Sequence, residues 1–273
     1  MAKAAATRAR SLAWLVRRRE DLSGVRILFY HRVADADDEL AVAPARFREQ
    51  MAALAQARYD VVTVADAASL LGRPADGRRR VIGLSFDDGY RDVAENALPV
   101  LERHGFRATV FVATGVVDGT SRFTWFDDHP PVLGWGEIGE LDGGTLEFEA
   151  HTVTHPNLVA VGDEQVRVEV AESKRVLEQR LGRPVATFCY PAGLFGARER
   201  SAVADAGFAW ATSCEPGVNT RATDPLALRR IQIDRRDRLV DFRAKVAGAH
   251  DRPLPLRSVY RRRRYGASGG RER

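Results

Sequence analysis

Residues 81–89 read Val81-Ile82-Gly83-Leu84-Ser85-Phe86-Asp87-Asp88-Gly89, a nearly continuous apolar run that stops at two carboxylates and a glycine. An apolar run without alternation is typical of a strand that is buried on both faces of a parallel sheet. Asp and Gly are common turn residues, so the strand is expected to end at Asp87. The stretch therefore predicts a buried parallel strand with two adjacent carboxylates at its carboxyl end.

Segments with strand character and segments with helix character alternate on both sides of this run. Strands are expected over 25–30, 60–64, 108–113, 145–150, 185–190, 208–212 and 228–233, and helices over 44–57, 66–71, 92–103, 136–141, 163–181, 197–206 and 239–248. This alternation predicts βα units with right-handed crossovers. We therefore expect an α/β fold in which about seven strands form a closed or nearly closed barrel, with the functional site at their carboxyl ends.

The composition is that of a soluble globular protein. The chain has 273 residues, of which 45% are hydrophobic and 8% aromatic, and one α/β barrel commonly reaches this length. Its two cysteines, Cys189 and Cys214, are too few for a disulfide scaffold and lack the spacing of a zinc or redox motif. We interpret both as small buried hydrophobic residues.

Positive charge is concentrated at the two ends of the chain. Residues 1–19 carry a net charge of +6 and residues 257–273 another +6, which leaves −7 for residues 20–256 because the total is +5. An acidic body argues against a nucleic-acid enzyme and predicts no nucleic-acid partner. We expect a basic N-terminal segment (1–24), a barrel domain (25–250) and a basic, disordered tail (251–273). The basic ends are either solvated or in peripheral contact with an anionic membrane.

The N-terminal segment contains an apolar run at residues 12–16, followed directly by three arginines. This run is too short for a secretory core or a transmembrane span. The sequence therefore predicts a cytoplasmic protein without a signal peptide or transmembrane helix, with peripheral contact at the inner membrane face as an alternative.

A pair of histidines follows another expected strand, in the sequence His151-Thr152-Val153-Thr154-His155. Two histidines at this spacing can direct both imidazoles toward one ion. Together with Asp88 they form a donor set that leaves coordination positions for water and a substrate oxygen. Asp87 is then available as a general base, so the set indicates metal-dependent hydrolysis of an amide or ester. Zn²⁺ is the expected ion, and Co²⁺, Ni²⁺ or Fe²⁺ also suits these donors.

Three motifs resemble those of the polysaccharide deacetylases, carbohydrate esterase family 4 or the NodB homology domain, and the resemblance covers roughly residues 25–235. Leu84 to Tyr90 looks like the first motif, in which the first Asp is the base and the second binds metal. His151 to His155 resembles the second motif, which supplies two histidine ligands. Phe188-Cys189-Tyr190-Pro191-Ala192-Gly193 is similar to the third motif, whose backbone helps to bind the oxyanion. The resemblance implies a distorted (β/α)7 barrel of the NodB homology type.

The resemblance also implies a set of substrate-binding residues. These are Tyr190, Pro191 and Ala192 in the third motif, and Trp210 and Leu228 where the family has apolar pocket walls. The third motif often contains an Arg that orients the base, but Cys189 or Tyr190 occupies that region here. The fifth motif usually supplies a His as general acid, whereas Leu228 to Ile233 contains none.

A candidate for the missing acid lies near the N-terminus. Tyr30-His31-Arg32-Val33 resembles the N-terminal motif of the poly-N-acetylglucosamine deacetylase branch, in which this His acts as the acid. We therefore expect His31 to be the general acid. It follows the first expected strand, so it should face the same opening as Asp87.

The predicted function is metal-dependent removal of N-acetyl groups from a carbohydrate, either a glycan or a lipid-linked or precursor amino sugar. Two alternatives remain open. The same metal site could act on a non-sugar amide or an O-acetyl ester, or the chain could be a non-catalytic glycan-binding module.

Overall fold

The computed structural model describes residues 7–9, 11, 13, 24–71 and 80–251. Most of the basic N-terminal segment and all but the first residue of the expected tail therefore lie outside the described residues, as does the predicted membrane contact. Among the helices in the described part of the chain, none is both long and apolar enough to cross a membrane.

Eight parallel strands form the main sheet. They are β1 (Arg26–Tyr30), β4 (Tyr59–Val62), β5 (Arg80–Phe86), β6 (Ala108–Val112), β7 (Leu146–Ala150), β8 (Thr187–Cys189), β9 (Trp210–Thr212) and β10 (Ile231–Gln232). Seven of them follow one another in the order β10-β1-β5-β6-β7-β8-β9, and β4 pairs with the first half of β5. A bridge between Thr212 and Leu228 joins the β9 end of the sheet to the segment that leads into β10. The expected (β/α)7 barrel is thereby confirmed, with β4 as an additional strand.

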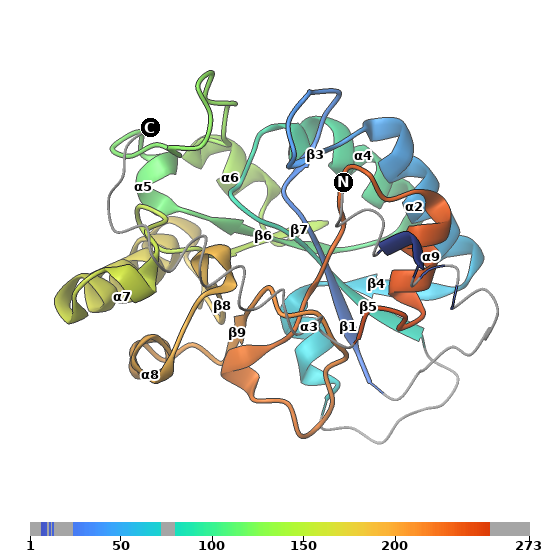
Figure 1. The fold of residues 1–273 in the computed structure, drawn as a ribbon. Helices are drawn as coiled ribbons and strands as arrows, with labels where there is room; N and C mark the ends of the chain where they lie inside the picture. The colour runs from blue at the N-terminus through green and yellow to red at the C-terminus, as the bar shows by residue number, and fades with distance from the viewer. Residues whose placement is uncertain (1–6, 10, 12, 14–23, 72–79, 252–273) are drawn as a thin grey trace.

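Helices surround this sheet (Figure 1). They are α2 (Pro44–Gln56), α3 (Val64–Ser69), α4 (Leu98–His104), α5 (Thr114–Val117), α6 (Trp135–Leu141), α7 (Asp163–Leu181), α8 (Ala197–Asp205) and α9 (Leu239–Val246). Helix α2 contacts both α4 and α9 on one side of the barrel, and α7 contacts α8 on the opposite side. The expected helices over 163–181 and 197–206 agree with α7 and α8 to within one residue.

Strand residues alternate between two hydrophobic clusters, as a period of two requires. Leu84 and Phe86 of β5 belong to the larger cluster, which includes residues of α2, α4, α7, α8 and α9 and therefore lies on the helix side. Ile27 and Phe111 belong to a smaller cluster inside the barrel, which helix α3 closes with Val64 and Ala68. Asp87, one position beyond Phe86, consequently faces the barrel interior.

Three local features differ from the expectations. Two short paired strands, β2 (Arg32–Val33) and β3 (Ala41–Val42), were not expected. The helix expected over 92–103 begins with a π-helical turn at Val93–Ala97, and α5 was not expected. Asp251, the last described residue, accepts a hydrogen bond from Arg26 Nε of β1 at 2.9 Å.

Candidate active site

The two carboxylates lie where β5 ends, in a tight turn. Asp88 and Gly89 both have left-handed backbone conformations, with φ values of 74° and 70°. This conformation is rare for a residue other than glycine and marks places where tertiary contacts hold the backbone in a fixed position. The described residues contain six such non-glycine positions, and four of them lie in the motifs of this site, at Asp88, Thr152, His155 and Ala192. Both carboxylates are buried, at 3% and 2% exposure for Asp87 and Asp88.

The histidine loop follows β7 and is held from α7. Glu169 Oε2 accepts hydrogen bonds from the backbone nitrogens of Val153 and Thr154 at 2.8 and 2.9 Å. Thr152 Oγ1 accepts another from the His155 nitrogen at 2.9 Å. The loop therefore has a defined shape although it is not helical. Glu169 was not identified from the sequence, but a signal was present, because this acidic residue lies on the mostly apolar buried face of α7.

Asp88, His151 and His155 form a candidate metal site, with one ligand atom from each within 4.8 Å of the others. Asp88 Oδ1 lies 3.5 Å from His151 Nε2 and 3.6 Å from His155 Nε2. Tyr90 hydrogen-bonds to the Asp88 carboxylate, but Oδ1 is buried and has no hydrogen-bond partner. An orphaned buried carboxylate oxygen facing two imidazole nitrogens fits a divalent cation.

The orientation of His151 and the ionisation of His155 and Asp88 also suit a metal. His151 Nδ1 lies 2.7 Å from the Cys189 carbonyl oxygen, which orients Nε2 toward Asp88. Burial lowers the pKa of His155 well below its ordinary value, so this imidazole is neutral and can act as a ligand. Burial raises the pKa of Asp88 to about 7, because its charge is unfavourable without a cation.

Asp87 is fixed by Arg230, which sequence analysis did not identify. Arg230 Nη1 donates to Asp87 Oδ1 at 2.6 Å and Nη2 donates to Oδ2 at 2.9 Å. Burial raises the pKa of Asp87, but the charge and hydrogen bonds of Arg230 outweigh this effect and hold the pKa below its ordinary value. Asp87 is therefore a carboxylate of fixed orientation. The available signal was an arginine directly before the apolar residue Ile231 in an expected buried strand, since such a charge requires a partner.

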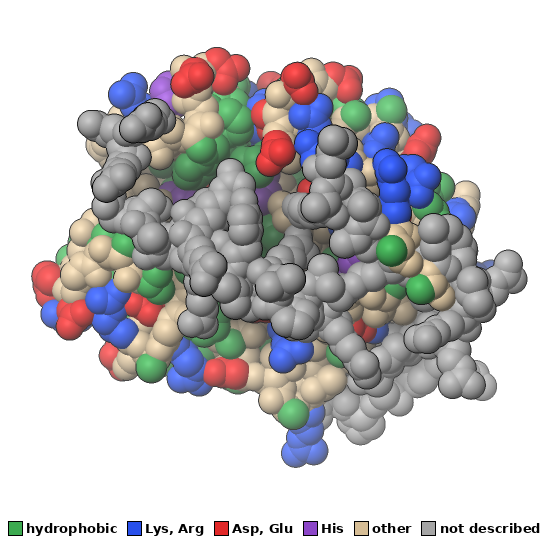
Figure 2. Space-filling view, viewed as in Figure 1, with side chains coloured by type: hydrophobic (Ala, Val, Ile, Leu, Met, Phe, Trp, Pro, Cys, Tyr) green, Lys and Arg blue, Asp and Glu red, His purple; other side chains and the backbone are tan. Residues whose placement is uncertain are grey.

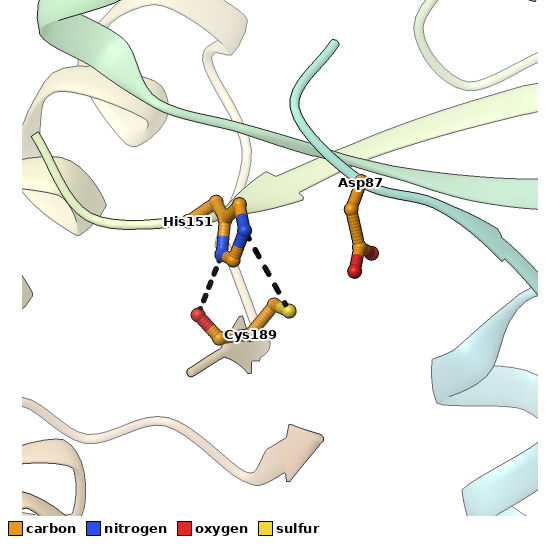
Figure 3. A group of neighbouring side chains, drawn as sticks. All are labelled: Asp87, His151 and Cys189. Carbon is orange, nitrogen blue, oxygen red and sulfur yellow. Dashed lines mark hydrogen bonds between the residues drawn. The ribbon is translucent and has the colours of Figure 1, made fainter. Parts of the chain in front are cut away.

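Figure 3 shows a second cluster of possible ligands, Asp87, His151 and Cys189, which shares His151 with the first. Arg230 already supplies a cation to this cluster, because its Nη2 is 3.1 Å from Cys189 Sγ as well as hydrogen-bonded to Asp87. A divalent ion in the same place would be repelled by the guanidinium. We therefore assign the candidate metal position to Asp88, His151 and His155. The interpretation of Cys189 as a small buried hydrophobic residue is confirmed, and its sulfur also contacts Arg230.

His31 directly follows β1 and lies on the same face as the carboxylates. Its charge contributes to lowering the pKa of Asp87, and it also acts on the pKa of His155. Its ring packs edge-on against Phe29, with the centroids 5.8 Å apart. The structure therefore brings His31 near the expected base and one expected ligand.

The expected substrate-binding residues divide into two groups. Pro191 and Ala192 lie in the turn after β8, and Leu228 bridges Thr212 at the same level of the barrel as Cys189. The ring of Tyr190 instead lies in the helix-side core, where its hydroxyl donates to the Leu226 carbonyl at 3.1 Å.

Trp210 is partly buried. It pairs with Thr187, two residues before Cys189, and packs against the interior cluster that includes Cys189 and Leu228. The ring of Tyr190 is therefore corrected from an expected substrate-binding group to a core residue, whereas the role expected for Trp210 stays a prediction.

Several known proteins are similar to this chain in sequence. The family model for polysaccharide deacetylases matches residues 75–211. A putative polysaccharide deacetylase, YxkH, of Bacillus subtilis (strain 168) is 25% identical over 221 residues, which cover 81% of this chain and 75% of that protein. A poly-beta-1,6-N-acetyl-D-glucosamine N-deacetylase of Staphylococcus aureus (strain MRSA252) is 26% identical over 57% of this chain. The match spans about half, 55%, of the staphylococcal protein.

Solved structures share the fold. The deacetylase PplD of Streptococcus pyogenes, in complex with acetate, has a TM-score of 0.70 at 23% identity, covering 78% of this chain and 93% of its own. IcaB from Ammonifex degensii has a TM-score of 0.69 at 22% identity, covering 84% and 99%. Together with the family match over residues 75–211, these findings show that the chain belongs to the polysaccharide deacetylase family and is a carbohydrate deacetylase with the family's (β/α)7 fold.

Proposed function

We propose that this carbohydrate deacetylase is a metal-dependent N-deacetylase in which Asp88, His151 and His155 hold the ion, Asp87 is the base and His31 is the acid. The observation that carries the proposal is the buried, unpartnered Asp88 Oδ1 facing two imidazole nitrogens. Zn²⁺ is the ion we expect, with Co²⁺, Ni²⁺ or Fe²⁺ as functional replacements.

A divalent ion bound there would lower the pKa of a water molecule and polarise the acetamide carbonyl. Asp87, ionised and held by Arg230, accepts the proton of the attacking water. The backbone N–H of Ala192 donates a hydrogen bond to the oxyanion as it develops. His31, as an imidazolium, protonates the leaving nitrogen, so that a free amine and acetate are released.

The substrate we propose is an N-acetylated amino sugar, in a glycan or in a lipid-linked or precursor form. The name of the staphylococcal relatives, which are poly-beta-1,6-N-acetyl-D-glucosamine N-deacetylases, supports this class. An amide substrate also suits the pairing of a base with a separate acid, because the departing amine needs a proton.

Acetate release from N-acetylglucosamine oligomers and from a lipid-linked N-acetyl sugar tests the proposal. Metal-stripped enzyme should be inactive and should regain activity with added zinc or cobalt. Asp87→Asn should lower kcat by about 10²–10⁴-fold while the protein still binds one equivalent of metal. His155→Ala should lose the metal, whereas His104→Ala, a change outside the site, should keep both metal and activity.

Two results would contradict the proposal. Full activity in the Asp87→Asn variant would exclude Asp87 as the base. Stoichiometric metal binding without acetate release from any sugar would favour a non-sugar amide or an O-acetyl ester as the substrate, or a glycan-binding module.

A further inference from the structure

An aromatic loop, residues 123–126, lies beside the candidate metal site. Its residues Phe123 and Phe126 pack on the Tyr90 ring with centroid separations of 5.6 and 6.0 Å. Trp125 is 43% exposed and is the only aromatic residue among the large exposed hydrophobic side chains in the described part of the chain. Exposure of a large apolar surface next to a catalytic centre indicates a binding surface.

The orientation of the Trp125 ring is fixed on three sides. Phe123 stacks on one face, with the centroids 4.6 Å apart and the planes at 28°. The His155 centroid is 4.9 Å from Trp125 and 5.6 Å from Phe123, which places His155 beside the edge of the indole rather than over its second face. Trp125 Nε1 donates to the Tyr90 hydroxyl at 3.3 Å. These contacts of the described residues therefore leave the second face of the indole open.

We propose that this open face of Trp125 is a platform on which a pyranose ring of the substrate stacks while its acetamide lies at the metal site. This inference rests on the proposed function and adds a specificity-determining residue to it. A sugar ring has apolar C–H faces and polar edges, so a flat aromatic surface covers its face and leaves its hydroxyl groups hydrated. The contact between Trp125 and His155 places this surface one side chain away from the candidate metal position.

The chain offers a matched control in Trp135. Its Nε1 donates to Asp118 Oδ1 at 2.6 Å, and the Arg180 guanidinium lies over its ring at 5.2 Å. Trp135 thus has its polar atom and one ring face occupied by other residues.

Figure 2 shows histidine together with hydrophobic side chains at a hollow in the face viewed, in keeping with a site of mixed apolar and polar character.

The experiment compares two acetyl donors, a tetramer of N-acetylglucosamine and ethyl acetate, which has no ring to stack. Acetate release is measured with the zinc-loaded wild type and with Trp125→Ala, Trp125→Phe and Trp135→Ala. Trp125→Ala should raise KM for the tetramer and lower the ratio of the two kcat/KM values, tetramer over ethyl acetate, by roughly tenfold, which corresponds to about 1.4 kcal/mol. Trp125→Phe should restore most of the ratio, and Trp135→Ala should keep the wild-type ratio.

A binding measurement separates this inference from the proposed function. Tetramer is titrated into zinc-loaded Asp87→Asn protein, and the change in tryptophan fluorescence is recorded. The change should persist when Trp135→Phe is added and disappear when Trp125→Phe is added.

The possible outcomes are distinct. An equal loss on both donors, or no loss on either, would overturn the platform, as would a fluorescence change that persists without Trp125. A fluorescence change that requires Trp125, in a wild type that releases no acetate from sugars, would support the platform and refute the proposed N-deacetylase function. Absence of tetramer binding would overturn the platform.

Discussion

Replacement of Arg230 by methionine should both destabilise the protein and disable the base. Methionine keeps an unbranched side chain of similar length but removes the charge. In the native protein the Arg230 and Asp87 side chains are 0% and 4% exposed and form two charged hydrogen bonds. The substitution leaves Asp87 buried without its cation.

The expected magnitude follows from this burial. Removal of one partner from a fully buried ion pair costs about 3–5 kcal/mol, because the remaining charge is desolvated and unpaired. Asp87 can avoid part of this cost by binding a proton, but a protonated Asp87 cannot act as a base. Since the guanidinium lowers the pKa of Asp87, its removal raises that pKa. The acid limb of the kcat/KM profile should therefore move to higher pH, and kcat near pH 7 should fall by roughly 10–100-fold.

The stability assay is urea unfolding of metal-free wild type, Arg230→Met, Asp87→Asn and the double variant. In the double variant no charge is left unpaired, so it should be more stable than the two single effects predict, with a coupling energy of about 2–3 kcal/mol. Arg230→Lys provides a milder variant if Arg230→Met does not fold. The control is Arg235→Met, which breaks an ion pair with Asp37, a side chain that is 98% exposed, and should cost less than about 1 kcal/mol. Additivity of the single effects to within about 0.5 kcal/mol would refute the reasoning.

Three further perturbations test other parts of the molecule. Burial raises the pKa of Asp88 to about 7, so below that pH a metal ion must displace a proton from this carboxyl group. Zinc affinity should therefore fall about tenfold for each pH unit below that value. A chelator-competition titration with no pH dependence would contradict this. Gly193→Ala should abolish activity and cost more than about 2 kcal/mol, since its φ is +65° and a Cβ would lie 2.3 Å from a backbone nitrogen. The matched variant Gly105→Ala, with φ of +64° and open space around it, should cost only about 1–2 kcal/mol in thermal or urea unfolding. Arg183→Leu should lower the free energy of unfolding by about 3–5 kcal/mol, because it leaves Glu149, which is 1% exposed, without its 3.0 Å ion pair. A decrease of less than about 1 kcal/mol in urea unfolding would contradict this.

The fold could be predicted largely from local patterns. A strand such as β5 is buried on both faces, so its apolar composition identifies it without knowledge of its neighbours. Helix α7 is long and periodic, and its ends were predicted correctly for the same reason. The short paired strands β2 and β3 were missed because each has two residues, too few to show a period. The π-helical turn at Val93–Ala97 was missed because its hydrogen-bond pattern leaves no distinct compositional signal.

The candidate site shows a different limit of prediction from the sequence. The adjacent carboxylates and the histidine pair could be recognised because their members are close in sequence and follow strands. The ring of Tyr190 was misplaced because a strand directs successive side chains to opposite faces. In the structure the Tyr190 ring points to the helix side, whereas Cys189, one residue earlier, belongs to the interior cluster. A motif identifies the strand end, but the face that each residue presents depends on register.

Arg230 illustrates why the group that fixes the base could not be located by motif alone. The expected orienting arginine belongs to the third motif, near Cys189, and that position was correctly found to lack it. In the folded chain, β10 lies next to β1, and the segment before β10 bridges β9. Arg230, directly before β10, therefore enters the interior where the barrel closes between β9 and β1. Its guanidinium then reaches Asp87 and contacts Cys189 Sγ at 3.1 Å. The requirement for a buried cation beside Asp87 is a consequence of electrostatics, whereas the strand that supplies it is set by how the barrel closes.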